Sequence, residues 1–224
     1  VDRYFRDGDA WVVTTAQGRV KARALVLATH SYSAEFSADL QPKMAREVVP
    51  VLSWQMATEP LGDNLRKTII PGRQAVSDTH GDLYFMRYDA RNRLVTGGAL
   101  VVPLNGHERL RPRIAARLQR IFPEIGDVTF SHVWNGYIGM TDDYCPRLHQ
   151  LGPNAYAWAG CNGRGVALGV ALGREFAAAV TGTPLNQLAM PLTDIRPLPF
   201  HGLVRRLAPL VLLEYRRRDA TEIA

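Results

Sequence analysis

The sequence predicts a mixed fold of the α+β/α/β type, in which a module of mainly antiparallel strands interrupts a module of alternating strands and helix. Two observations lead to this prediction. Strand-like segments with a single helical pattern among them fill residues 48–133. A short apolar strand, a glycine-rich turn and a long apolar helix follow one another at 155–180, which is the order of an α/β unit.

The composition of the 224 residues is that of a globular protein, with 46% hydrophobic and 21% charged residues, which argues against disordered and fibrous classes. The net charge of +6 is moderate, so we expect no nucleic-acid partner. Two cysteines and six scattered histidines predict neither a disulfide framework nor a metal site. We find no apolar run long enough to span a membrane and no signal segment after Val1, and we expect a cytoplasmic piece of a longer protein.

The first 47 residues read as strands. Residues 9–15 and 19–27 flank a turn at Gln17-Gly18, which predicts a hairpin. The run 24–28 is apolar throughout, as in a strand covered on both faces, and it ends in the small and polar residues 29–33.

In the middle module we expect strands at 49–58, 83–88, 93–100 and 130–134, with a turn at 90–92. Apolar residues recur at helical spacing in 114–122, and Pro112 and Pro123 are expected to bound that helix. Residues 134–147 mix glycine, proline and acids, which predicts a loop.

The turn at 160–165 is the strongest local signal. It leads into a helix at 166–180 that is apolar enough to predict burial on all sides. A helix N-terminus with glycines can hold a phosphate, a carboxylate or the edge of a flavin ring, and a tight connection without any ligand explains the same spacing. In the tail, 183–224, we expect a helix at 203–215 that Pro209 kinks or divides. Its arginines suggest a docking segment with a solvated basic face, with contact to an anionic membrane surface as the alternative.

Five short motifs follow one another over about residues 20–182. They lie at 24–33, at 58–61, in the strand pair 83–87 and 94–98, at 134–147 and at 160–168. In this order they resemble "VVLATGAYS", "TEPL", "YYR…LLFGG", "WGG…DMTPDRLPHIG" and "GYSGHGVAL" of FAD-dependent amine and amino-acid oxidoreductases of the D-amino-acid oxidase superfamily. The chain resembles the C-terminal half of these proteins, and within them the gamma-glutamylputrescine oxidoreductase group. It departs from the pattern at His30, where Gly is usual, and at Arg164, where His is usual.

The resemblance implies a partial FAD-binding Rossmann-like domain interleaved with an antiparallel-sheet substrate domain. On that map, residues 1–47 end the FAD-binding domain, 48–133 form the substrate domain, 134–182 return to the flavin and 183–224 are a C-terminal tail. The G-x-G-x-x-G motif of the family is absent from this sequence. We therefore expect the full-length protein to bind FAD, and this chain to lack FAD unless a missing N-terminal portion of the same protein joins it.

The implied activity is oxidation of the C–N bond of a small amine or amino acid, by hydride transfer to flavin. The resemblance names no catalytic residue. Three residues are expected to bind substrate: Trp54, Tyr84 and Arg87. The expected FAD-binding residues are Ala28, Thr29, Trp134, Gly136, Asn162, Gly163, Arg164, Gly165, Val166 and Ala167. The alternative function is a non-catalytic module whose glycine loop binds an anion or nucleotide.

Overall fold

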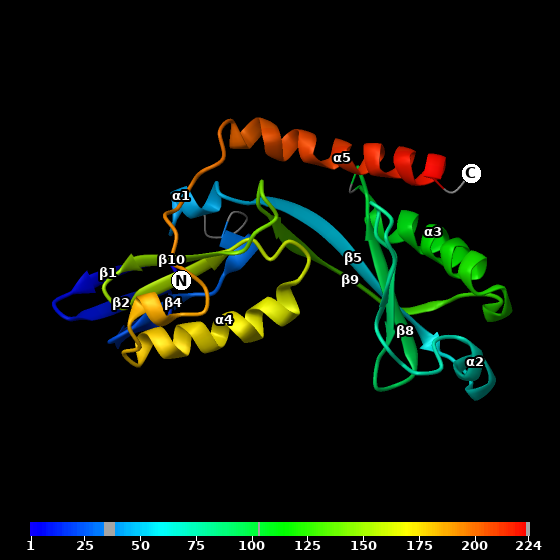
Figure 1. The fold of residues 1–224 in the computed structure, drawn as a ribbon, viewed down its shortest axis with the longest axis horizontal. Coiled ribbons are helices and arrows are strands. Elements are labelled where there is room, and N and C mark those ends of the chain that lie inside the picture. The colour runs from blue at the N-terminus through cyan, green and yellow to red at the C-terminus, as the bar shows by residue number, and fades with distance from the viewer. Residues whose placement is uncertain (34–38, 103, 223–224) are drawn as a thin grey trace. The chain divides into compact units, whose positions relative to one another are not determined.

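The computed structural model describes residues 1–33, 39–102 and 104–222. The chain divides into two compact units (Figure 1). Unit 1 comprises Val1–Val51 and Tyr137–Arg205, and unit 2 comprises Leu52–Gly136 and Arg206–Ala224. Three elements run from one unit into the other: strand β5 (Val49–Pro60), strand β9 (Phe130–Met140) and helix α5 (His201–Glu222).

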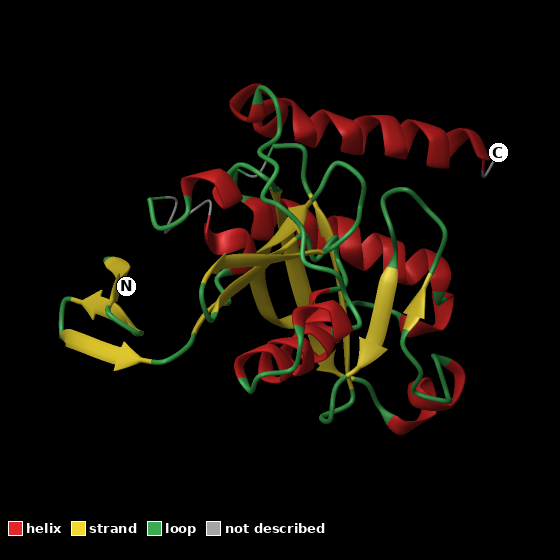
Figure 2. Ribbon diagram, turned by 60° about the vertical axis from the view of Figure 1, so that its left-hand side comes forward, coloured by secondary structure: helices red, strands yellow, loops and turns green. Residues whose placement is uncertain are grey.

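Unit 1 contains two small sheets. Strands β1 (Arg3–Asp7), β2 (Ala10–Thr15) and β3 (Gly18–Ala22) pair antiparallel in a separate sheet, seen beside the N-terminus in Figure 2. This confirms the predicted hairpin at Gln17-Gly18. The second sheet has the order β10 (Arg147–Gly152), β11 (Ala155–Ala159) and β4 (Leu25–Leu27), with β11 antiparallel to β10 and parallel to β4.

Helix α4 (Gly165–Val180) packs on the second sheet through one face only. Leu172 and Phe176 join Leu148, Tyr156 and Trp158 in one buried cluster. The predicted burial on all sides is wrong, because Val166 is 88% exposed and Val170 is 71% exposed on the other face. The strand at 24–28 is not covered on both faces either, because the side chain of Val26 in β4 is 39% exposed. β4 is also the edge strand of its sheet.

Unit 2 is built on a five-stranded sheet with the order β6 (Val76–Ser77), β7 (Phe85–Tyr88), β8 (Arg93–Ala99), β5 and β9. The predicted turn between β7 and β8 is confirmed, and Asn92 adopts the left-handed conformation there, with φ of +61°. Helix α3 (Gly106–Ile121) covers one face of the sheet. It buries Leu110, Ile114 and Leu118 against core residues that include Met56 and Leu94.

Helix boundaries depart from the prolines that were expected to set them. Helix α3 begins at Gly106 and contains Pro112, because Leu110, Ile114 and Leu118 form one continuous buried stripe while Pro112 lies on the exposed side. Helix α5 is likewise a single helix that contains Pro209. Two short helices, α1 (Pro42–Ala45) and α2 (Asp63–Thr68), lie where no helix was expected.

The predicted loop at 134–147 is mostly a strand. Strand β9 continues to Met140, β10 begins at Arg147, and only residues 141–146 connect them. Among the described residues, no helix is long and apolar enough to cross a membrane, and no three potential metal ligands gather.

Candidate functional site

The glycine-rich turn between β11 and α4 requires its unusual backbone. Gly160, Asn162 and Gly163 have φ of +79°, +47° and +82°, the left-handed region that glycine and asparagine tolerate best. A Cβ on Gly160 would lie 2.6 Å from Cγ2 of Thr141, so a larger residue would clash there. A Cβ on Gly163 would meet no atom within 4 Å, so this part of the turn faces open space.

The side chain of Asn162 ties the turn to the end of β9. Its Oδ1 accepts the backbone N–H of Thr141 at 2.9 Å, and its Nδ2 donates to the carbonyl of Gly160 at 2.9 Å. Its backbone N–H donates to the carbonyl of Gly139 at 3.0 Å. These bonds fix the turn from both sides, so the entry to helix α4 is held in one conformation.

His30 holds the same turn from β4. Its Nε2 lies 2.8 Å from the backbone nitrogen of Cys161 and accepts that N–H, while its ring packs on Trp158 with centroids 4.2 Å apart. Burial lowers the pKa of His30 to about 4, so the ring is neutral near pH 7 and can accept. The φ of His30 is +49°, which explains why a glycine suits this position.

The N-terminus of α4 offers uncovered donors. The first hydrogen bond into the helix runs from the N–H of Leu168 to the carbonyl of Arg164, at 3.0 Å. The N–H groups of residues 165–167 therefore precede the helix's own bonding pattern, and the side chain of Val166 among them is exposed. The guanidinium of Arg164 turns to the carbonyl of Tyr144, to which Nη2 donates at 2.8 Å. These donors fit the electron-rich edge of a flavin ring.

Several predicted cofactor residues lie together in unit 1. Ala28 and Thr29 follow β4, directly before His30, and residues 162–167 form the turn that His30 holds and the start of α4. Ala28 also lines an open, mostly apolar cavity of about 490 Å³. Its other lining residues are Val26, Trp158, Gly169, Leu172, Gly173, Phe176, Ala177 and Val180. The two remaining predicted residues, Trp134 and Gly136, belong to the part of β9 in unit 2, where Trp134 is exposed.

The three predicted substrate residues lie on different faces of the unit 2 sheet. Trp54 faces α3, because its indole stacks on His107 of that helix. Its strand partner Gly98 lies on the same face, since a Cβ added there would be 3.5 Å from Ile114 of α3. The ring of Tyr84 also faces α3, with the Arg117 guanidinium 3.5 Å from its centroid.

Arg87 alone of the three is exposed on the face away from α3. It pairs with Val95, between Met86 and Tyr88, which are buried toward the helix. Because neighbouring residues of a strand point to opposite faces, the sheet cannot bring Arg87 together with Trp54 or Tyr84.

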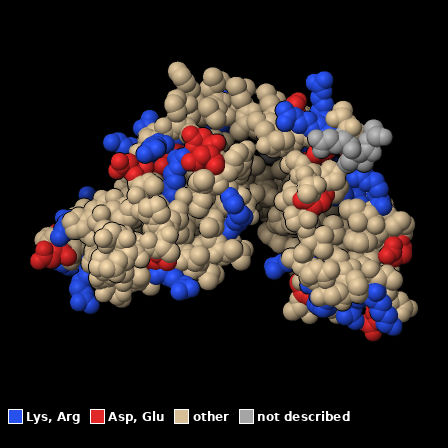
Figure 3. All heavy atoms as spheres, viewed as in Figure 1, with Lys and Arg blue, Asp and Glu red and all other residues tan. Residues whose placement is uncertain are grey.

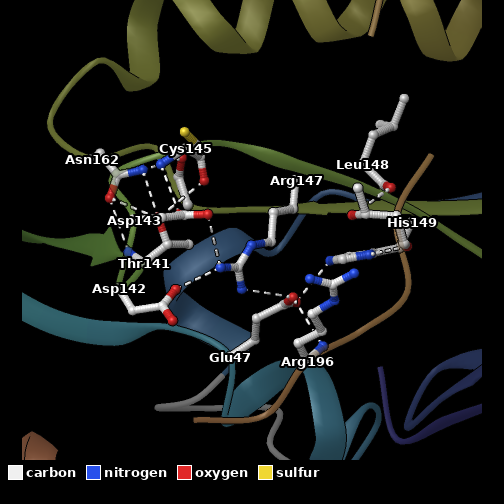
Figure 4. A network of polar contacts seen from close by, with 12 residues as sticks. Glu47, Thr141, Asp142, Asp143, Cys145, Arg147, Leu148, His149, Asn162 and Arg196 are labelled. Carbon is white, nitrogen blue, oxygen red and sulfur yellow. Dashed lines mark hydrogen bonds and ion pairs between the residues drawn. The ribbon is translucent and has the colours of Figure 1, made fainter. Parts of the chain in front are cut away.

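A buried ionic network, which the sequence did not indicate, supports the loop before β10 (Figure 4). Oε1 of the fully buried Glu47 accepts from Nη1 of Arg147 at 3.0 Å and from the backbone N–H of Arg196 at 3.1 Å. His149 Nε2 lies 2.7 Å from Glu47 Oε2. Burial raises the pKa of Glu47, but the contact with His149 and the bonds from Arg196 and Arg147 outweigh it and lower that pKa overall.

Arg147 extends this network to the loop. Its Nη2 reaches Asp142 at 2.5 Å and Asp143 at 3.3 Å, so the paired acids hold a buried cation instead of standing free in solvent. Thr141, the residue before Asp142, is the hydrogen-bond partner of Asn162 in the glycine turn. The ionic network therefore stabilises residues 141–143, and this segment in turn holds the glycine turn.

Comparisons with known proteins identify the family of the chain. The family model described as "FAD dependent oxidoreductase" matches residues 1–179. Gamma-glutamylputrescine oxidoreductase of Escherichia coli is 28% identical over 171 residues, covering 76% of this chain and 39% of that protein. A probable oxidoreductase, OrdL, of Rhizobium meliloti is 27% identical over 191 residues, covering 83% of this chain and 43% of that protein.

The fold is shared with solved structures as well. Glycine oxidase from Geobacillus kaustophilus superposes with a TM-score of 0.63 at 20% identity, over 87% of this chain and 51% of that one. In each comparison the chain spans roughly two fifths to one half of the length of its relative.

Proposed function

Because the chain belongs to the family of FAD-dependent oxidoreductases, we propose that it forms the flavin-side and substrate-side part of an enzyme that oxidises a C–N bond of a small amine or amino acid. The family match and the names of the relatives support the reaction class. FAD, when bound, supplies the two-electron acceptor for this oxidation. The observation that carries the proposal for this chain is the turn at 160–165, which leaves the first N–H groups of α4 uncovered.

In this proposal the chain's own residues bind and position. The N–H groups of residues 165–167 would hold the electron-rich edge of the flavin as hydrogen-bond donors. Asn162 and His30 keep those donors in place through their bonds to Thr141 and Cys161. Arg87, exposed on the face of its sheet away from α3, is the candidate for binding a substrate carboxylate.

We further propose that FAD binding needs an N-terminal portion of the longer protein. Strand β4 is the edge of its sheet, and the open cavity beside it is lined by Val26, Ala28, Gly169 and Gly173. An edge strand and an exposed apolar helix face suit the addition of another strand and helix.

An absorbance spectrum tests both proposals. The longer protein should carry a flavin band close to one per chain, and the 224-residue chain purified alone should be colourless. A flavin band at near-equal ratio in the isolated chain would refute the need for the N-terminal portion. A longer protein that binds no flavin but still binds anions at the turn would instead support the non-catalytic alternative.

Three other expectations stay predictions. On the face shown in Figure 3, Lys and Arg side chains are interspersed with Asp and Glu, which does not favour a nucleic-acid partner. The cytoplasmic location rests on the sequence alone, and so does the preference for a docking role of the basic tail over a membrane contact.

A further inference from the structure

Unit 2 contains a polar cavity of about 350 Å³ on the α3 side of its sheet, apart from Arg87. It lies between α3, the C-terminal part of α5 and the segment that precedes β7. Its lining residues are His80, Asp82, Tyr84, Arg113, Arg120, Arg216, Asp219 and Ala220.

Positive charge dominates the floor of this cavity. Three guanidinium groups surround one oxygen of the buried Asp82, with Nε of Arg216 at 2.8 Å, Nη2 of Arg113 at 3.3 Å and Nη2 of Arg117 at 3.6 Å. One carboxylate cannot neutralise three cations. Burial lowers the pKa of Arg113, and the nearby charge of Arg216 lowers it further, as expected where like charges crowd together.

The second acidic residue of the cavity lining, Asp219, already accepts hydrogen bonds from the backbone. Asp219 accepts the backbone N–H of Gly81 at 2.8 Å with one oxygen and that of Asp82 at 3.0 Å with the other. Arg120 adds a fourth cation, and its Nη2 donates to the hydroxyl of Tyr84 at 3.0 Å. Within the cavity lining, three guanidinium groups face two carboxylates, which leaves an excess of one positive charge, and Arg117 lies behind them next to Asp82.

His80 adds a second, independent indication of a ligand. Its ring stacks on Tyr84 with centroids 4.5 Å apart, and its Nδ1 lies 2.6 Å from Asp78, which is outside the cavity lining. Its Nε2 is buried and has no hydrogen-bond partner. A buried polar atom is rarely left without a partner, so a group that binds in the cavity would satisfy it.

We propose that this cavity binds an oxyanion, with inorganic phosphate or the phosphate group of a small metabolite as the ligand class. A phosphate carries a charge of about −1.5 to −2 near neutral pH, so the positive excess of the lining attracts it. Its oxygens suit the fork of guanidinium donors. The Nε2 atom of His80, which has no partner in the described structure, would add a further polar contact. A single carboxylate offers two acceptor oxygens to these donors, whereas a phosphate group offers three.

The test uses the 224-residue chain and needs no flavin, so it is independent of the proposed oxidation. Inorganic phosphate is titrated calorimetrically at constant ionic strength, with sulfate, acetate and glycerol phosphate in parallel. We expect saturable binding of phosphate and sulfate and much weaker binding of acetate. Tighter binding of glycerol phosphate than of inorganic phosphate would identify a phosphorylated metabolite as the source.

Arg120→Gln removes one exposed cation of the cavity without touching Asp82. It should weaken phosphate binding about tenfold, as expected for the loss of a charge-assisted hydrogen bond. Arg111→Gln on the same helix is the matched control: Arg111 is exposed and lies outside the cavity lining, and the change should alter affinity less than about twofold.

Arg113→Gln offers a second variant if Arg120→Gln fails to fold, since 39% of the Arg113 side chain is exposed. The proposal is overturned if phosphate shows no saturable binding to the wild-type chain. Equal weakening by Arg111→Gln and by the cavity variants would overturn it as well, because the binding would then reflect net charge alone.

Discussion

Replacing His30 by phenylalanine tests whether this residue positions the flavin-side turn. Phenylalanine keeps a ring beside Trp158 but removes the acceptor that lies 2.8 Å from the nitrogen of Cys161. Cys161 is buried, so its N–H is left without a partner, at a cost of about 1–3 kcal/mol. At pH 7.5 we therefore expect the amide of Cys161 to exchange with solvent roughly five- to a hundredfold faster in the variant.

The effect should depend on pH with a definite sign. The pKa of His30 falls from an unfolded value of about 6.5 to about 4 on folding, so the unfolded chain binds the proton more readily. The stabilisation is present above pH 6.5 and is lost as the pH falls toward 4. This difference corresponds to about 3 kcal/mol over the whole window. At pH 4.5 the wild-type chain has lost most of it, so the deficit of His30→Phe seen at pH 7.5 should largely disappear.

Hydrogen exchange of the Cys161 amide at both pH values, corrected for the intrinsic rate, measures this directly. His107→Phe is the matched control, because His107 also stacks on a tryptophan but is exposed, and it should leave the Cys161 amide unchanged. A deficit of His30→Phe that is the same at pH 7.5 and pH 4.5 would refute the assignment of a neutral acceptor. Unchanged exchange at pH 7.5 would refute the hydrogen bond itself.

Two further substitutions probe the supports of the site. Glu47→Gln should lower the free energy of unfolding by about 3–5 kcal/mol, because it removes the charge that faces the buried Arg147. The control Glu108→Gln, on the exposed side of α3, should lower it by less than about 0.5 kcal/mol. Urea denaturation of both variants measures the two values. Gly163→Ala should lower the free energy of unfolding by about 1 kcal/mol, because the φ of Gly163 is +82°. Gly165→Ala, at the first helical position, should lower it less. Equal melting temperatures for the two variants would contradict this explanation.

The sequence by itself determined the local structures whose signals lie within a few residues. The hairpin at Gln17-Gly18, the turn before Arg93 and the succession of β11, glycine turn and α4 all follow from turn residues and apolar periodicity. The five ordered motifs likewise led to the family, because a motif is a property of neighbouring residues.

Only the tertiary structure decided which of the predicted residues lie together. Strand composition placed Trp54 and Arg87 in one module, but the register turns them to opposite faces of the sheet, and α3 covers one face only. The extent of helix α3 was also decided by packing, which prevailed over the expectation that the helix begins after Pro112.

The residues that hold the glycine turn could not be predicted from the sequence, because their partners are distant in the chain. Glu47 meets Arg147 across a separation of 100 residues, and His30 meets Cys161 across 131. A lone glutamate or histidine in a sequence carries no mark of its distant partner. The pKa of His30 is lowered by burial among segments that are distant in the chain, so this lowering arises only once the chain has folded.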